Sequence, residues 1–517
     1  MYQIYLSRSR YFFNRYWILI LLIMIKFVLQ FVLVNPVYEL HRDEFLHLDQ
    51  AFHPAAGYIS VPPFTSWIAS LIYLFGGGIF WIRFFPALFG ALTIVFAWLI
   101  AEETGGRLGA KIFTAVSLIF SVLVRMNVLL QPNSFDILAW TIIFYLLIRY
   151  VNTGNVKWLM LLSVITALGF YNKYNVVFLL AGLFTGLLVT RQRTIFTKRF
   201  FYIALSFSVV LILPNIIWQI KNHFPVIHHM EALSKSQLVN IKHIDFLKDQ
   251  VKFGLTGLLT LAAFWAFIFY KPFRQYRFIG WTFIVTLALF TLLRAKNYYS
   301  VGLYPVMFAL GSVYLESLLK KAGTAVFSLL AAVNIVIFFL LANYLMPLRS
   351  PSEIMPHLKS YEKMGLLRWE DGKNHLLPQD FADMQGWREM ADKALQAYKM
   401  IPVNELDKTL IYCDNYGQTG ALNYYDRSKM PKAYSGITDY IFWMPRLKEI
   451  RNIVYVGKLP KHEFVEMFDT LRIVGTVENE FAREKGTTIF LLLGGSHEVT
   501  EDFYKYAEER KRNFKIF

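Results

Sequence analysis

The sequence predicts a polytopic α-helical membrane protein with about 11 transmembrane helices and a C-terminal α/β domain. Of its 517 residues, 56% are hydrophobic and only 17% are charged, and the mean hydropathy is +0.40. In soluble domains, about a quarter of the residues are charged. Aromatic residues make up 17% of the chain, as expected where rings gather at membrane–water interfaces.

A membrane-spanning helix needs about 20 mostly apolar residues. The first candidate, 15–35, is too long for the apolar part of a signal peptide and has no small-residue cleavage site, so we interpret it as an uncleaved anchor. The full set of candidate spans is 15–35, 79–101, 110–126, 134–151, 157–172, 174–190, 201–218, 251–270, 278–294, 299–319 and 323–346.

Basic residues in the short loops predict the orientation of these spans. Arg8, Arg10 and Arg15 precede the first span, which favours a cytoplasmic N-terminus. Each even-numbered span then returns the chain to a cytoplasmic loop that carries basic residues: Arg107, Lys111, Arg149, Lys157, Arg191, Arg193, Lys198, Arg199, Lys271, Arg274, Arg277, Lys320 and Lys321. Eleven spans place the tail outside, so we expect a multi-pass membrane protein with an extracytoplasmic C-terminal domain.

The net charge of +17 comes entirely from the apolar part of the chain. Residues 347–517 contain 25 basic and 25 acidic residues, whereas residues 1–346 contain 28 basic and 11 acidic residues. A basic surplus confined to membrane loops argues against nucleic-acid binding. The single cysteine, Cys413, excludes an internal disulfide framework and a cysteine-based metal cage.

Two domains are expected, 1–346 in the membrane and 347–517 outside it. The outer loop 36–78 belongs to the first and holds an apolar stretch, Phe64 to Phe75, that is too short to cross and suits an interfacial helix. A further outer segment, 219–250, joins two spans. The tail alternates apolar runs with helical patterns, which predicts an α/β domain. Its expected strands are Thr409–Tyr412, Asn452–Val456 and Thr487–Leu493, and its expected helices are 383–399 and 461–471.

Acidic residues are scarce in the membrane part, and four of them cluster just outside the first span, at Glu39, Asp43, Glu44 and Asp49. Asp43 and His47 are four residues apart and would share one face of a helix. Asp43 could cap a helix with Glu44 in its first turn. A catalytic carboxylate is the alternative, because ionisable groups at a membrane are often functional. The residues leave both interpretations open.

Basic residues usually gather in cytoplasmic loops. Those predicted to lie on the outer side go against this preference and are therefore candidates for a functional role. Arg294 and Lys296 lie in one short loop beside Tyr298 and Tyr299, and Lys173 lies in another. Such cations can pair with lipid head groups. They are also the groups that hold a phosphate diester and stabilise a phosphate leaving group.

Other candidate sites are less specific. Asp136, at the outer start of a span, could cap its helix or line a cavity beside Asp43. Histidines 223, 228, 229 and 243 share one outer segment but lack the spacing of a zinc motif. A divalent metal ion is a possible cofactor, since Asp43, Glu44 and Asp136 could attract one, but the ligand set is incomplete. Phosphate-loop and dinucleotide fingerprints do not occur in the sequence.

An ordered series of motifs resembles bacterial GT-C membrane glycosyltransferases, in the branch of the protein O-mannosyltransferases and the lipid A aminoarabinose transferase. The series covers nearly the whole chain. It consists of Asp43-Glu44, Gly57-Tyr58, Pro62-Pro63, Asn133-Ser134-Phe135-Asp136, Asn172-Lys173-Tyr174, Leu213 to Gln219, Phe224-Pro225, Lys296 to Tyr299 with Tyr304-Pro305, Leu377-Pro378-Gln379, Asp383 to Trp387, Asn415-Tyr416-Gly417 and Gly420-Ala421-Leu422.

The resemblance implies an enzyme that transfers a sugar, with inversion, from a polyprenyl phosphate to an extracytoplasmic lipid, glycan or protein acceptor. It implies that Asp43 is the general base and that Glu44 supports it. Lys296, with Arg294, Lys173 and Arg42, would hold the donor phosphate. The residues expected to line the cavity are His47, Tyr58, Pro62, Asp136, Tyr298 and Tyr299.

One departure from the family pattern limits this transfer of roles. Many relatives carry an acidic residue and then His or Lys before the paired prolines, where this chain has Ser60 and Val61. The donor chemistry would then depend more on the loop of Arg294 and Lys296. A lipid-linked sugar transporter or binding protein without chemistry is the main alternative, although transporters usually place their carboxylates near the midplane. A membrane-anchored module whose tail binds a partner would leave the acidic loop unexplained.

Overall fold

The computed structural model describes residues 2–241, 243–251, 255–319 and 322–513. The chain divides into two compact units, which are described separately below. The first, here called the helical unit, consists of Met1–Val34, Gly77–Ile216 and Ile241–Leu348. The second, here called the mixed unit, consists of Asn35–Gly76, Ile217–Asn240 and Arg349–Phe517. The loop expected to belong to the membrane domain therefore groups with the tail.

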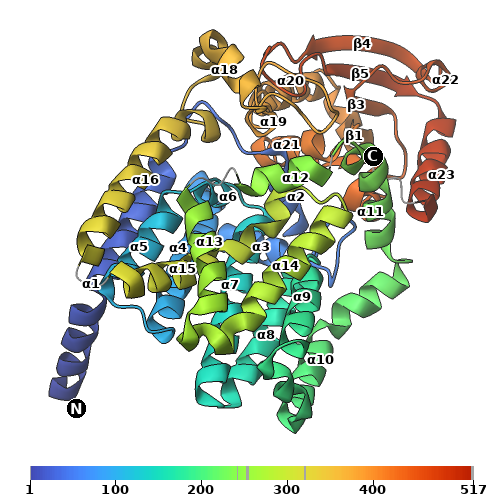
Figure 1. Cartoon of the computed structure of the whole chain (residues 1–517). Helices are drawn as coiled ribbons and strands as arrows, with labels where there is room; N and C mark the ends of the chain where they lie inside the picture. Colours follow the sequence, from blue (N-terminus) through green and yellow to red (C-terminus); the bar gives the residue numbers. More distant parts are fainter. Residues whose placement is uncertain (1, 242, 252–254, 320–321, 514–517) are drawn as a thin grey trace. The chain divides into compact units, whose positions relative to one another are not determined.

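Helices occur at all eleven predicted span positions, and Figure 1 labels them. They are α1 (Tyr2–Val32), α4 (Ile79–Glu103), α5 (Leu108–Ile119), α7 (Pro132–Thr153), α8 (Lys157–Asn172), α9 (Val176–Leu188), α10 (Arg199–Lys221), α13 (Leu255–Phe269), α14 (Arg277–Leu292), α15 (Tyr304–Leu319) and α16 (Gly323–Leu345). Shorter elements connect them: α6 (Leu123–Met126), η1 (Arg191–Thr197), α12 (His243–Val251), η3 (Lys271–Tyr276) and η4 (Asn297–Leu303).

By length and composition, seven helices among the described residues can cross a membrane, or eight if the bent pair α9 and η1 forms one span. The count of eleven therefore stays a prediction. Helices α5, α8 and α13 are not among these seven, because each is shorter than 18 residues. Part of the predicted span 251–270, at 252–254, and the predicted cytoplasmic Lys320 and Lys321 lie outside the described residues.

The core of the helical unit is built around large aromatic side chains. Trp98 of α4 and Trp140 of α7 are fully buried, and α7 packs against α4, α8 and η4. Gly302 of η4 lies where a Cβ atom would come within 2.7 Å of the Trp140 ring. The missing side chain therefore lets η4, which follows Lys296, approach α7, which carries Asp136.

The mixed unit contains a five-stranded sheet in the order β2-β1-β3-β5-β4, and Figure 1 labels β1, β3, β5 and β4. The strands are β1 (Thr409–Cys413), β2 (Ala433–Ser435), β3 (Asn452–Gly457), β4 (Phe468–Thr476) and β5 (Thr488–Gly495). Strand β1 pairs in parallel with β2 and β3, whereas β5 pairs antiparallel with β3 and β4. In register, Ile411 lies opposite Val454, and Tyr455 lies opposite Phe490.

Helices and turns complete the mixed unit. Helix α20 (Trp387–Lys399) packs on β3, β4 and β5, and α21 (Tyr416–Tyr425) packs on β1 and β2. The other elements are α2 (Arg42–Gln50), α3 (Phe64–Leu74), α11 (Pro225–Ser236), η2 (Leu238–Asn240), α17 (Pro351–Ile354), η6 (Met355–His357), α18 (Leu358–Lys363), α19 (Gln379–Ala382), η7 (Val403–Lys408), η8 (Thr438–Phe442), α22 (His462–Val465) and α23 (His497–Asn513).

The three predicted strands are confirmed as β1, β3 and β5, and the predicted short helix at Phe64 is α3. The predicted helix 461–471 is wrong, because only the short α22 forms there and β4 begins at Phe468. Strand β4 is an edge strand with one exposed face, so its sequence shows no buried run; Ile473 is 69% exposed. The predicted helix 383–399 begins later, at Trp387, after Gly386 in a left-handed conformation with φ of 83°.

Candidate functional site

Helix α2, which carries the acidic cluster of the outer loop, begins with a complete capping box. The Asp43 amide donates to Nδ1 of His41 at 3.2 Å, and the Glu44 carboxylate accepts from the His41 amide at 2.7 Å. The expectation that Asp43 caps the helix is therefore wrong: His41 is the cap, and Glu44 supplies the reciprocal bond. Asp43 stands in the first turn with its carboxylate available for other contacts.

The Asp43 carboxylate is held by a tyrosine from the tail. The Tyr416 hydroxyl donates to Oδ1 of Asp43 at 2.8 Å, and Nδ1 of His41 lies 3.8 Å from Oδ2. The Arg42 guanidinium lies over the Tyr416 ring, 4.5 Å from its centroid. Burial raises the pKa of Asp43, but the neighbouring His41 and Arg42 and the Tyr416 hydrogen bond outweigh it and lower the pKa to about 2. The side chain keeps 37% of its surface exposed, so it is accessible from the solvent.

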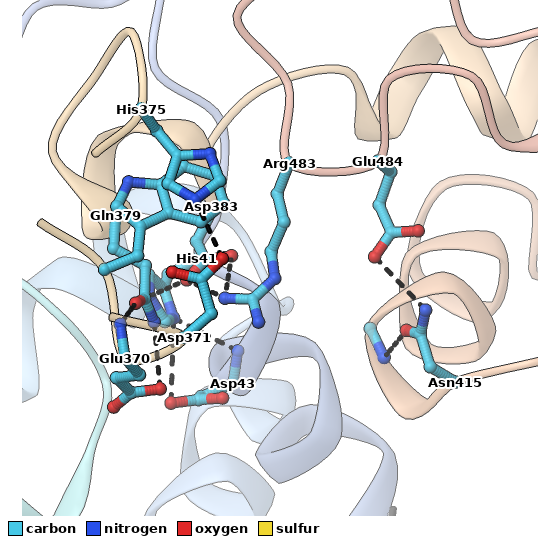
Figure 2. Close-up of polar contacts among 12 residues, drawn as sticks. His41, Asp43, Glu370, Asp371, His375, Gln379, Asp383, Asn415, Arg483 and Glu484 are labelled. Atoms are coloured by element: carbon cyan, nitrogen blue, oxygen red, sulfur yellow. Dashed lines mark hydrogen bonds and ion pairs between the residues drawn. The ribbon is translucent and has the colours of Figure 1, made fainter. Parts of the chain in front are cut away.

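An ion pair between the buried Asp383 and the partly exposed Arg483 lies next to this cluster (Figure 2). Both oxygens of Asp383 accept from Nη1 of Arg483 at 3.2 Å, and Nε2 of His41 lies 3.6 Å from the Asp383 carboxylate. The Arg42 amide donates to the Asp383 carbonyl at 3.2 Å. Burial raises the pKa of Asp383, against the opposing charges of Arg483 and Arg42. The start of α2 is thus fixed by residues more than 300 positions away.

The position of Tyr416 follows from the cap of its own helix. The side-chain oxygen of Asn415 caps α21 by accepting from the backbone amides of Gly417 and Gln418. The side-chain nitrogen of Asn415 donates to the Glu484 carboxylate at 3.1 Å (Figure 2). Gln418 completes a capping box and also donates to Glu484 at 2.7 Å. Tyr416 is therefore the first residue of a firmly anchored helix.

The other end of α2 is anchored by a second buried carboxylate. Oδ2 of Asp49 accepts from Asn423 at 2.7 Å and from the Tyr440 hydroxyl at 2.6 Å. Burial raises the pKa of Asp49 to about 6, despite these two donors. Tyr58, expected to line the cavity, is 2% exposed and donates to the carbonyls of Gln50 and His53. Tyr58 therefore holds the turn after α2 together.

A cationic cluster lies in the helical unit. The Lys173 ammonium donates to Oδ1 of Asn133 at 2.9 Å and lies over the rings of Tyr299 and Tyr298, at 4.2 and 5.1 Å from their centroids. Lys173 is also within electrostatic range of Asp136 and Lys296. The structure thus brings together five residues predicted for the donor site or the cavity: Lys173, Lys296, Asp136, Tyr298 and Tyr299.

Two further predicted residues have other surroundings. Arg294 has a left-handed backbone with φ of 52°, and its Nε donates to His243 at 3.4 Å. Pro62 is buried immediately before α3. The predicted site residues divide between the two units: Arg42, Asp43, Glu44, His47, Tyr58 and Pro62 belong to the mixed unit, and the others belong to the helical unit.

Residue-by-residue reasoning from the sequence missed Tyr416, Asp383 and Arg483 as parts of the site. The sequence could have indicated Asp383 and Tyr416, because both residues lie in tail motifs that resemble those of the family. Arg483 lies in a polar turn between β4 and β5 with no pattern of its own.

The charged clusters do not form an evident metal site. Within the described ranges, no group of three or more His, Cys, Asp or Glu side chains is arranged to hold a metal ion. Glu44, one of the three residues considered for a divalent ion, is fully buried and bonds the His41 amide.

Comparisons with known proteins agree with the resemblance seen in the motifs. Residues 60–218 match the family model of dolichyl-phosphate-mannose-protein mannosyltransferase. A search of curated protein sequences finds no match.

Solved structures similar to this chain include ArnT from Cupriavidus metallidurans. ArnT bound to undecaprenyl phosphate matches with a TM-score of 0.62 and 15% identity, over 92% of this chain and 98% of that chain. Apo ArnT matches with a TM-score of 0.59 and 14% identity over the same shares. The archaeal oligosaccharyltransferase AglB from Archaeoglobus fulgidus matches with a TM-score of 0.47 and 12% identity, over 81% of this chain and 65% of that chain. The chain therefore has the fold of a GT-C membrane glycosyltransferase and resembles the ArnT branch, as the motifs predict.

Proposed function

We propose that this chain is an inverting glycosyltransferase of the bacterial inner membrane. It moves a hexosyl or pentosyl group from a polyprenyl-phosphate donor to a lipid, glycan or protein acceptor on the extracytoplasmic side. The mannosyltransferase family model and the ArnT fold support this class, and one ArnT structure is described as bound to undecaprenyl phosphate.

The observation that carries the proposal is the Asp43 carboxylate. It is kept ionised by its neighbours, partly exposed, and fixed in direction by the Tyr416 hydroxyl. A polyprenyl-phosphate sugar already has a good leaving group, so the enzyme must orient the acceptor hydroxyl, remove its proton and neutralise the departing phosphate. Asp43 receives the acceptor proton while the acceptor oxygen bonds to the anomeric carbon and the bond from that carbon to the phosphate oxygen breaks.

The cationic cluster around Lys173 and Lys296 meets the remaining requirement, which is to neutralise the departing phosphate. Lys173 is fixed by Asn133 and by the faces of two tyrosines, and Lys296 lies within its electrostatic range. Two neighbouring ammonium groups, of which Lys173 is held in place, stabilise the charge that develops on a leaving phosphate. The proposal therefore assigns the donor phosphate to Lys173 and Lys296.

The test uses the purified full-length protein and polyprenyl-phosphate sugars, both hexoses and pentoses, labelled in the sugar. Transfer releases free polyprenyl phosphate and labels a component of an added envelope extract, whereas a transporter or binding protein leaves every donor intact. Mass analysis of envelope lipids and glycans from cells that lack the protein identifies the acceptor.

We expect Asp43→Asn to lower transfer by at least about 10²-fold, the usual contribution of a general base, while expression and donor binding stay close to wild type. Asp502→Asn, an exposed carboxylate of α23, is the matched control and keeps full activity. Full activity of Asp43→Asn would remove the assignment of Asp43 as the base.

A further inference from the structure

The surroundings of Asp43 raise a question about the acceptor proton. A carboxylate whose pKa is lowered to about 2 accepts a proton in a transition state but does not keep it at neutral pH, because base efficiency is greatest when the pKa is near the working pH. A second group near Asp43 that can take the proton would complete the base.

His47 is in the right place on the same helix. It lies one turn after Asp43, so the two side chains share a face of α2. The His47 side chain is 3% exposed and is within electrostatic range of Asp43. Its Nδ1 atom lies 3.0 Å from Oε1 of Gln50.

The hydrogen bonds beyond His47 determine which of its nitrogens carries the proton. Oδ1 of Asp439 accepts from the Ile59 amide at 2.7 Å, and Oδ2 accepts from Nε2 of Gln50 at 2.8 Å. An ionised carboxylate only accepts, so the Gln50 amide must turn its nitrogen to Asp439 and its oxygen to His47. Nδ1 of His47 must then donate, and the lone pair is left on Nε2.

Electrostatics keep this imidazole neutral. Burial lowers the pKa of His47, and the charges of Asp43 and Glu44 oppose the shift without cancelling it. The other titratable groups around it are His41 at the start of α2 and Asp439 of η8. At neutral pH His47 is therefore an unprotonated base whose tautomer is fixed.

We propose that His47 takes from Asp43 the proton that Asp43 removes from the acceptor hydroxyl, and that Gln50 and Asp439 are positioning residues which present the Nε2 lone pair. This inference rests on the proposed function. As the acceptor oxygen bonds to the anomeric carbon and polyprenyl phosphate departs, the proton passes from the hydroxyl to Asp43 and on to Nε2 of His47. The imidazolium then loses its proton to water before the next turnover.

The first test is the pH profile of His47→Gln. The wild-type kcat falls in the acidic range where His47 becomes protonated, because protonated His47 cannot accept a further proton, and burial shifts this range below the ordinary pKa of histidine. We expect His47→Gln to lower kcat at pH 7 on the order of 100-fold, to remove this acid limb, and to leave the affinity for the polyprenyl-phosphate donor within twofold. A merely structural role would lower activity without removing the limb. Wild-type kcat with an unchanged limb would overturn the proposal.

The second test leaves His47 in place and disturbs only its orientation. Asp439→Asn frees the Gln50 amide to turn, so His47 loses its fixed tautomer, and we expect kcat to fall roughly 10-fold at unchanged donor affinity. Asp502→Asn is the control, since Asp502 is an exposed carboxylate of α23; it retains the wild-type kcat. Equal kcat values for all three proteins would overturn the role of Asp439.

These outcomes separate the inference from the proposed function. If the wild-type protein releases no polyprenyl phosphate from any donor, the proposed function fails. If the wild type transfers sugar and both His47→Gln and Asp439→Asn transfer equally well, only the second step of the proton path fails. Should His47→Gln not fold, as judged by its thermal unfolding and donor binding, Asp439→Asn alone decides the question.

Discussion

At the scale of single residues, the two charged clusters use opposite means to fix a side chain. Asp43 is held by donors that favour its charged form, whereas Lys173 is held by an amide oxygen and by the negative faces of two aromatic rings. In the proposed reaction, both arrangements would leave a charge ready before a substrate arrives, so that less reorganisation is needed during the reaction.

Lys296 gives the clearest prediction for donor binding. Lys296→Ala removes one of two neighbouring ammonium groups, so we expect the Kd for the polyprenyl-phosphate donor to rise about 10-fold, and the KM for the acceptor to change little. Equilibrium binding of the labelled donor in detergent measures the effect. Lys157→Ala, an exposed lysine at the start of α8, is the control, and an unchanged donor Kd for Lys296→Ala would contradict the phosphate role.

At the scale of elements, the acidic loop depends on a close contact between α2 and α21. Phe45 of α2 packs against Trp387, Tyr424 and Tyr425. A Cβ atom on Gly420 of α21 would lie 2.6 Å from Cβ of Phe45 and 3.0 Å from its backbone. The absence of a side chain at Gly420 therefore sets the distance between the two helices, and with it the position of Asp43 relative to Tyr416.

Gly420→Ala tests this contact. The added methyl group must push two backbones apart, so we expect a loss of roughly 1–3 kcal/mol of stability and reduced transfer activity. Gly257→Ala is the control, because Gly257 is also helical but no atom would lie within 4 Å of its new Cβ; there we expect no loss. Thermal unfolding in detergent measures both variants, and equal unfolding midpoints would contradict the packing argument.

The elements also show where sequence patterns suffice. Strands β1, β3 and β5 are predicted because each is a buried apolar run that is visible locally. Strand β2 has only three residues, and edge strand β4 gains its conformation from pairing with β5. The start of α20 depends on Glu39, whose carboxylate accepts from the amides of Gly386 and Arg388. A pattern in residues 383–399 cannot contain that information.

At the scale of the whole molecule, the mixed unit is assembled from three separate stretches of chain. Its buried carboxylates join those stretches: Asp49 contacts Asn423 and Tyr440, and Asp439 contacts Gln50 and the Ile59 amide. The acidic loop and the tail thus fold as one unit, although the residues that join them are more than 300 positions apart in sequence.

This arrangement predicts that stability depends on pH. Burial raises the pKa of both Asp49 and Asp439 to about 6, above the ordinary value of a carboxyl group. A raised pKa in the folded state gives stability that is complete below the unfolded pKa near 4 and is lost as pH rises through about 6. Each group contributes about 2–3 kcal/mol of this change. The thermal unfolding midpoint should therefore decrease as pH is raised from 5 to 7.5, and it should decrease less steeply in Asp49→Asn. A thermal unfolding midpoint that increases over that pH range would contradict the assignment.

The sequence by itself determined the membrane class of the chain, the positions of the candidate membrane helices, three strands of the sheet and the two groups of charged residues, because each follows from local composition or period. It could not determine which tail residues hold Asp43, that His41 and not Asp43 caps α2, or that the loop groups with the tail. The first and last of these features depend on hydrogen bonds and helix packing between residues hundreds of positions apart, and such contacts leave no periodic trace in either segment. The His41 cap is local, but histidine is not among the usual capping residues.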